Sequence, residues 1–257
     1  MRGLLALAAA FCVLAFQGAA TGTAASPFRD WAAVVVAGDW RASGGEQPTQ
    51  AFENARRDIH GALLSAGFEP GHVRTLSLKE GTPAADLTTG PNLAAALKQT
   101  ASAAPAGCLF YLTSHGSPQG AVFGRQGLLA PGVLDRLLKD ACQDRPTVVF
   151  LSACYSGVYL PALAAPNRLV LTAARPDRAS FGCGSDDKYP FYDACVLQVW
   201  PTSADFLALG QAVRSCVARR EQELRLAPAS EPQMHAGARI RPLLPLLPLP
   251  GARRPAA

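Results

Sequence analysis

Two residues of this sequence can together carry nucleophilic chemistry, because a histidine and a cysteine each follow a strongly apolar segment. His115 comes after Cys108–Thr113 (CLFYLT), and Cys154 comes after Thr147–Leu151 (TVVFL). A thiol becomes a good nucleophile when it loses its proton, and a nearby imidazole can accept that proton or pair with the anion. A cysteine after a strand is by itself usually a core residue, and a His-Gly pair is often only a turn. Together, at the ends of two strand patterns, they predict a catalytic dyad.

Small residues surround both members of the predicted dyad. Gly116 follows His115 and offers a backbone N–H that no side chain obstructs, while Ser156 and Gly157 follow Cys154 in a small-residue turn. If the two strands are neighbours, the N–H groups of Gly116 and Cys154 can face an oxyanion that develops on a carbonyl substrate. The spacing is therefore typical of acyl-transfer chemistry.

The elements that must position the dyad alternate along the chain between strand and helix patterns. Buried strands are predicted over residues 32–37, 108–113, 147–151 and 168–172, a strand nearer an edge over 73–78, and a small hairpin over 120–124. Helices are predicted over 52–66, 90–97, 131–141 and 202–217, the last starting with a capping box of Thr202 and Asp205. This alternation predicts an α/β domain with a mostly parallel sheet and right-handed crossovers. Sites in such sheets gather beyond the carboxyl ends of the central strands, where both dyad residues stand.

Composition supports a folded domain and gives no sign of nucleic-acid binding. Hydrophobic residues make up 49% and charged residues 17% of the chain, which is enough apolar material for a core. The formal net charge of +5 is mild and evenly spread, unlike the basic patches that bind nucleic acid. The segment from Pro242 to Pro250 (PLLPLLPLP) can form neither a regular helix nor a central strand. We therefore expect one domain over residues 26–227 and a largely disordered tail over 228–257.

The first 25 residues have the order of a secretory signal. Arg2 precedes an apolar run from Leu4 to Phe16, and small residues with plausible cleavage sites after Ala20 or Ala25 follow. The run is too short to span a bilayer comfortably, so no stable membrane span is expected after cleavage. An uncleaved anchor, or a lipoprotein modified at Cys12, are the alternatives. The expected location is a periplasm or the outside of the cell.

Six cysteines remain after such a cleavage, and an oxidising compartment favours disulfides among them. They are Cys108, Cys142, Cys154, Cys183, Cys195 and Cys216. If Cys154 is a free nucleophile, at least one other must also stay unpaired. Cys183 and Cys195 flank a polar loop and are the bridge we expect, whereas Cys108 can be a small buried apolar residue. The histidines outside the dyad have no spacing typical of a metal site, and none is predicted.

The two blocks around the dyad resemble a known family. Residues 111–117 (YLTSHGS) and 151–157 (LSACYSG) resemble the catalytic blocks of legumain-like cysteine peptidases, the C13 group, which is related more distantly to caspases, gingipains and the catalytic subunit of the GPI transamidase. Residues 34–39, 172–181 and 188–194 resemble further family segments in the same order. The resemblance implies a caspase-like three-layer α/β sandwich, no cofactor, and cleavage of peptide bonds through an acyl-enzyme.

The resemblance also implies roles for individual residues. Cys154 corresponds to the nucleophile, His115 to the general acid and base, and Gly116 to the residue that donates an N–H to the oxyanion. Asp39 stands near the place where some relatives have an orienting asparagine, and could position His115. A strand-end aspartate that only caps a turn is the alternative for Asp39.

The residues expected to bind the substrate depart from the family pattern. Legumain grips asparagine with an arginine before the first helix and a glutamate two residues before the cysteine, and those places here correspond to Pro48 and Ser152. Asp193 matches the retained pocket acid, and Ser180 matches a pocket wall. Strict asparagine preference is therefore not expected. A lone acid would favour a basic or polar P1 side chain, with Asp193 as a solvated helix residue the alternative.

The leading hypothesis is an exported cysteine endopeptidase that acts on peptides or proteins. A transpeptidase or transamidase would use the same nucleophile and let an amine rather than water resolve the acyl-enzyme. A catalytically silent protein that kept the fold for binding is the third hypothesis, and the altered pocket residues leave it open.

Overall fold

The chain folds around one six-stranded sheet that helices cover on both faces. The computed structural model describes residues 26–125 and 127–250. The strands of the main sheet are β1 (Trp31–Ala37), β2 (Val73–Leu76), β3 (Gly107–Thr113), β7 (Thr147–Ser152), β8 (Arg168–Thr172) and β9 (Gln233–Ala236). The helices are α1 (Ala51–Ser65), α2 (Gly90–Ala103), α3 (Pro131–Cys142), α4 (Leu160–Leu163), α5 (Phe191–Val199) and α6 (Phe206–Glu223).

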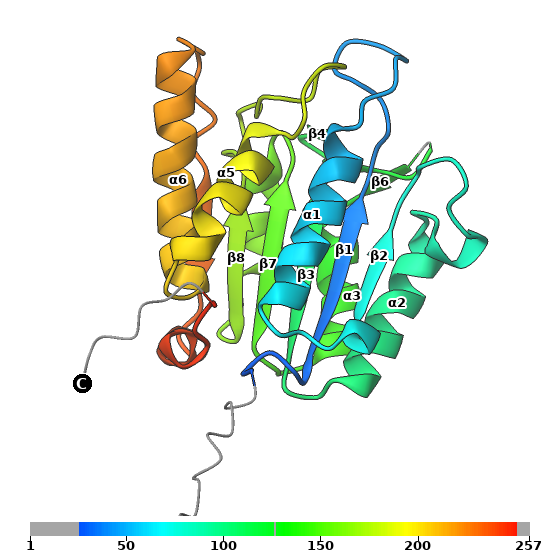
Figure 1. Cartoon of the computed structure of the whole chain (residues 1–257), viewed down its shortest axis with the longest axis vertical. Coiled ribbons are helices and arrows are strands. Elements are labelled where there is room, and N and C mark those ends of the chain that lie inside the picture. Colours follow the sequence, from blue (N-terminus) through cyan, green and yellow to red (C-terminus); the bar gives the residue numbers. More distant parts are fainter. Residues whose placement is uncertain (1–25, 126, 251–257) are drawn as a thin grey trace, which may run out of the picture.

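The strand order is β2-β1-β3-β7-β8-β9, and every neighbouring pair is parallel except β8 and β9. Figure 1 shows the parallel strands side by side with their carboxyl ends toward the top. All residues of β1, β3, β7 and β8 are buried, as expected for strands with helices on both faces. The predicted α/β class with a mostly parallel sheet is confirmed.

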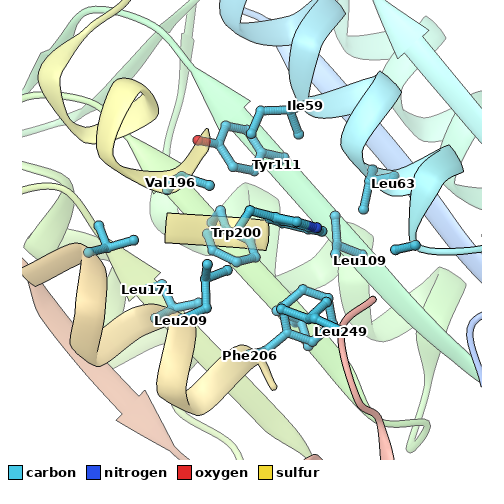
Figure 2. Close-up of a cluster of buried hydrophobic side chains, with 14 of the residues drawn as sticks. Ile59, Leu63, Leu109, Tyr111, Leu171, Val196, Trp200, Phe206, Leu209 and Leu249 are labelled. Carbon is cyan, nitrogen blue, oxygen red and sulfur yellow. The ribbon is translucent and has the colours of Figure 1, made fainter. Parts of the chain in front are cut away.

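Two apolar clusters, one on each face of the sheet, hold the layers together. In one cluster, α1, α5 and α6 pack on residues of β3 and β8, and Figure 2 shows Ile59, Leu109, Leu171 and Leu209 meeting there. The other cluster joins α2, α3 and α4 to the opposite face through residues such as Leu93, Leu134 and Leu163. Because strand side chains alternate between faces, a continuous apolar strand contributes to both clusters.

Several local predictions need correction. The expected hairpin is a three-stranded antiparallel sheet of β4 (Gly116–Ser117), β5 (Gly120–Phe123) and β6 (Gly127–Leu129), which begins directly after His115. The predicted capping box is wrong, because Thr202 lies in a 3-10 turn. The Asp205 carboxylate itself caps α6 by accepting from the N–H groups of Leu207 and Ala208. Helix α5 was not predicted as a separate element.

The prediction of a disordered tail beyond Pro228 is wrong for the part of the tail that the structure describes. β9 extends the main sheet beside β8, and a 3-10 helix over Arg241–Leu246 follows. Ile240, Leu244 and Leu249 are buried in the cluster on the α6 side, where Figure 2 shows Leu249 close to Phe206. The prolines do prevent a regular helix or strand, but the leucines between them still bury apolar surface. Residues 251–257, like the predicted signal over 1–25, lie outside the described residues.

The cysteine pairing also differs from expectation. Cys108 bonds to Cys142, and Cys195 bonds to Cys216, so the predicted bridge between Cys183 and Cys195 is wrong. Cys195 on α5 faces the neighbouring helix α6, which carries Cys216. Cys183 lies in the preceding loop and packs against Ala37 and Phe52 instead. Among the described cysteines, Cys154 and Cys183 are free. This agrees with the expectation that at least one further cysteine stays unpaired if Cys154 does.

One buried ion pair yields a stability prediction. The Arg168 side chain is 2% exposed, and its Nη1 lies 2.8 Å from Oδ1 of Asp135 on α3. We expect Asp135→Ala to lower the free energy of unfolding by about 3–5 kcal/mol, because a buried guanidinium loses its counter-ion. Lys139→Ala removes the exposed partner of the same carboxylate and should cost less than about 1 kcal/mol. Urea unfolding measures both, and equal losses would contradict the prediction.

Candidate active site

The parallel pairing of β3 and β7 brings the two predicted dyad residues to the same edge of the sheet. The register pairs Thr113 with Ser152 at the ends of the strands, and the N–H of Ser114 donates to the Ser152 carbonyl over 3.0 Å. His115 and Cys154 each stand two residues beyond that last pair. Both side chains therefore emerge beyond the carboxyl ends of adjacent central strands, where sites of parallel sheets form.

Contacts from two other segments orient the His115 ring. Nε2 lies 2.9 Å from the carbonyl oxygen of Arg41, in the segment that follows β1. The Phe52 ring of α1 meets the imidazole edge-on, with centroids 5.0 Å apart and planes at 82°. Because a carbonyl oxygen only accepts hydrogen bonds, Nε2 carries the proton of the neutral ring. Nδ1 has no hydrogen-bond partner among the described residues and is the nitrogen free to exchange a proton.

The Cys154 sulfur is half-buried in a sharp turn. The N–H of Ser180 donates to Sγ over 3.2 Å, and the carbonyl oxygen and Oγ of Ser180 each lie 3.5 Å from it. Tyr155 adopts the left-handed conformation (φ 57°, ψ 12°), which is uncommon for a bulky residue. Its N–H donates to the Arg178 carbonyl over 2.7 Å. The segment around Ser180 thus lies directly against the turn that presents the thiol.

Two glycines at the site are required by packing. A Cβ added to Gly116 would overlap the carbonyl oxygen of Cys154, so only glycine lets the two backbones approach this closely. A Cβ on Gly157 would lie 2.6 Å from the ring of Pro176. Gly157 therefore allows the close packing of this turn against Pro176.

Asp39 is linked to His115 through Arg41 and not by a direct hydrogen bond. Its buried carboxylate accepts from the N–H groups of Trp40 and Arg41, and from the Arg41 guanidinium over 3.1 and 3.2 Å. This contact raises the pKa of Arg41. The carboxylate has no direct hydrogen bond to His115 in the described part of the chain. It holds the Arg41 backbone, whose carbonyl oxygen in turn bonds the imidazole. Arg41 could not be found from the sequence, because its contribution to the site is a backbone oxygen.

The predicted pocket residues separate into two groups. Ser180 touches the Cys154 sulfur, whereas Ser152 and Asp193 are buried and bond to each other, with Ser152 Oγ 2.6 Å from Asp193 Oδ2. The Asp193 carboxylate also accepts from the hydroxyls of Tyr111 at 2.5 Å and Thr113 at 2.9 Å. Burial raises the pKa of Asp193 to about 6, although the three hydroxyls oppose this shift. With no exposed surface, Asp193 is neither a solvated helix residue nor an open pocket acid in this structure.

Two hollows lie at the same edge of the sheet. One, of about 340 Å³, is lined by His115, Gly116 and the loop of residues 41–45. The other, of about 560 Å³, shares Asp39 with the first and extends past Pro48 toward Lys79 and Arg125. The described residues contain no group of three histidine, cysteine or acidic side chains that could hold a metal ion.

The second free cysteine lies close to this site but in a different environment. Cys183 is buried against Ala37 and Phe52, and its carbonyl oxygen accepts from the N–H of Ser43. Burial, and then the nearby charge of Cys154, raise the pKa of the Cys183 thiol to about 12. It therefore stays protonated at neutral pH, unlike a nucleophilic thiolate. The sequence pattern did not predict that Cys183 lies beside this site.

Comparison with known proteins agrees with this geometry. Residues 92–205, which include both dyad residues and Asp193, match the model of the peptidase C13 family. No curated protein matches the sequence significantly. Among solved structures, caspase-1 from Spodoptera frugiperda is similar in fold, with a TM-score of 0.58 and 15% sequence identity. The match covers 82% of this chain and 88% of that caspase chain. Residues 92–205 thus resemble the peptidase C13 family, and the fold of the described chain is similar to that of a caspase.

Proposed function

We propose that the chain is an exported cysteine endopeptidase in which Cys154 is the nucleophile and His115 the general acid and base. One observation carries the proposal: the ends of β3 and β7 bring imidazole and thiol to one edge of the sheet, with the Gly116 backbone against the Cys154 carbonyl. The family match supports a cysteine-peptidase function of this kind. The peptide-bond specificity and the acyl-enzyme mechanism are part of the proposal.

The proposed reaction has two halves. The Cys154 thiolate attacks the scissile carbonyl carbon, and the oxyanion that forms is stabilised by the N–H of Gly116. His115, held through Nε2 by the Arg41 carbonyl, takes the proton of the Cys154 thiol on Nδ1 and gives it to the leaving amine as the C–N bond breaks. Water then attacks the thioester while Nδ1 accepts one of its protons. The C–S bond breaks, the carboxylic acid leaves, and the proton returns from Nδ1 to the Cys154 sulfur.

Two features support export. The first 25 residues have the charge, apolar run and small-residue end of a signal peptide. The fold contains two disulfides, Cys108–Cys142 and Cys195–Cys216, and disulfides persist in oxidising compartments. In the described chain, no helix is long and apolar enough to cross a membrane. We infer a periplasmic or secreted enzyme that acts on proteins or peptides without a cofactor.

The proposed substrate preference is broader than that of legumain. Pro48 and Ser152 stand where legumain has its arginine and glutamate, so the contacts that read asparagine are absent at these two positions. Asp193 is fully occupied by three hydroxyls and offers a poor anchor for a basic P1 side chain. Ser180, which lies at the sulfur, is the pocket residue placed to contact the substrate near the scissile bond.

Digestion of a peptide library by the purified mature chain tests the proposed function. We expect cleavage by the parent, none by Cys154→Ala or His115→Ala prepared in the same way, and a P1 profile that is not restricted to asparagine. Mass spectrometry of products formed with an added amine separates hydrolysis from transpeptidation, because only a transpeptidase would join the amine to most of the acyl product. Equal cleavage by Cys154→Ala would overturn the proposal. A parent that cleaves nothing would favour a silent binding protein.

A further inference from the structure

One buried carboxylate bridges the two strands that carry the dyad. Oδ2 of Asp193 accepts from Thr113 Oγ1 over 2.9 Å and from Ser152 Oγ over 2.6 Å. Thr113 and Ser152 are register partners on β3 and β7. Each stands two residues before a dyad member, since His115 follows on β3 and Cys154 on β7. A single oxygen atom thus bonds to the residue two positions before each of the two proposed catalytic residues.

The bridge lies on the same face of the sheet as the contacts to the imidazole. Asp193 belongs to the first turn of α5, which packs beside α1 on one face, and Phe52 of α1 touches the His115 ring. In an extended chain, residues i and i+2 face the same side, so the Thr113 hydroxyl and the His115 side chain share that face. A shift of Asp193 would therefore move Thr113 and Ser152, and with them the dyad residues that follow on the same strands.

Covalent and backbone contacts keep α5 in place. Cys195, two residues after Asp193, is bonded to Cys216 of α6. At the other end, the N–H of Phe191 donates over 2.9 Å to the carbonyl oxygen of Phe181, next to Ser180 at the sulfur. Gly182 lies so close to the Phe191 ring that an added Cβ would overlap it. Helix α5, which carries the carboxylate, is thus held by a disulfide on one side and contacts the loop that lies against Cys154 on the other.

We propose that Asp193 is a positioning residue that fixes the separation of His115 and Cys154 by bridging Thr113 and Ser152, and does not bind the P1 side chain. This inference rests on the proposed function of the dyad. A pocket acid needs an oxygen that a substrate can reach, but Asp193 is 0% exposed and already accepts three hydroxyl hydrogen bonds. A P1 cation would have to displace one of these donors and open the core around it.

Asp193→Ala is the first test, because alanine removes the oxygen that accepts from both hydroxyls. Asparagine would not test the bridge, since its carbonyl oxygen can still accept from both. We expect kcat to fall about 10- to 100-fold, because the dyad loses its fixed spacing. KM should stay within about threefold of the parent value, and the P1 profile from the peptide library should be unchanged, since the variant removes no substrate contact. A changed P1 profile with kcat retained would identify Asp193 as a pocket acid and overturn the proposal.

Two further variants separate positioning from general stability. Tyr111→Phe removes the donor to Oδ1 while the bridge at Oδ2 remains, so its kcat should stay within about threefold of the parent even if the protein loses stability. Thr113→Val keeps the shape of the side chain and breaks one arm of the bridge, so its kcat should fall as in Asp193→Ala. Thr113→Val takes the place of Asp193→Ala if Asp193→Ala does not fold by circular dichroism. Equal losses of kcat in Tyr111→Phe and Thr113→Val would overturn the proposal.

Alkylation of Cys154 by iodoacetamide distinguishes failure of this inference from failure of the proposed function. At neutral pH, we expect slower alkylation in Asp193→Ala and in His115→Ala than in the parent, because the imidazole no longer meets the thiol correctly. Tyr111→Phe should keep the parent rate. If the parent cleaves no peptide, the peptidase proposal fails. The alkylation rates of Cys154 still test whether Asp193 positions the dyad. An unchanged alkylation rate in Asp193→Ala would overturn the positioning role.

Discussion

Cys154→Ala is expected to lower kcat/KM for any cleaved peptide by at least about 10⁴-fold, since it removes the nucleophile on which the proposed acyl-enzyme depends. Cys183→Ala should leave kcat/KM within about threefold, although both cysteines are free and lie close together. Their environments explain the contrast. The Cys154 sulfur is half-buried at the sheet edge that carries His115, whereas Cys183 is buried in an apolar cluster and burial raises its pKa to about 12.

Mass spectrometry after iodoacetamide treatment of the folded protein checks the same contrast without a substrate. Cys154 should be alkylated and Cys183 should stay unmodified until the protein is unfolded, because the thiolate is the reactive form. Peptide cleavage by each variant is measured in parallel. Full activity in Cys154→Ala together with loss of activity in Cys183→Ala would show that Cys183, and not Cys154, is the nucleophile.

Gly116→Ala is expected to lower kcat about 100-fold or more, because a shift of about 1 Å in reacting groups is enough for a loss of that size. The added Cβ would overlap the carbonyl oxygen of Cys154 and lie 3.1 Å from the Cβ of Ala153. Both contacts belong to the turn that holds Cys154, so relief of the overlap must move either Cys154 or the Gly116 N–H. The free energy of unfolding should also fall, by about 1–3 kcal/mol, as in other overpacked sites.

Gly61→Ala is the matched control for this substitution. Gly61 lies within α1, and a Cβ there would meet nothing within 4 Å. Alanine is preferred over glycine inside a helix by about 1 kcal/mol, so the variant should be as stable as the parent or more stable, with kcat unchanged. Stopped-time peptide assays and thermal unfolding of both variants provide the comparison. A Gly116→Ala enzyme with parental kcat would show that the close approach of the two backbones is dispensable.

The sequence by itself determined the parallel sheet and the position of the dyad. The predicted strands over 108–113 and 147–151 agree with β3 and β7 to within one residue at each end. Such strands are buried on both faces, so their apolar runs are continuous and easily recognised. Because the carboxyl ends of parallel strands meet at one edge, His115 and Cys154 could be placed together from their spacing after each run.

Only the tertiary structure decided what surrounds the dyad. Asp39 reaches His115 through the Arg41 backbone, and Asp193 bonds residues that are about 40 and 80 positions away in the chain. Local patterns carry no information about such contacts, since each depends on which helix packs over which strand. The same holds for the disulfide of Cys195, whose partner is decided by the packing of α5 on α6. The C-terminal segment is folded for a related reason: its leucines find a place on the core that composition alone does not reveal.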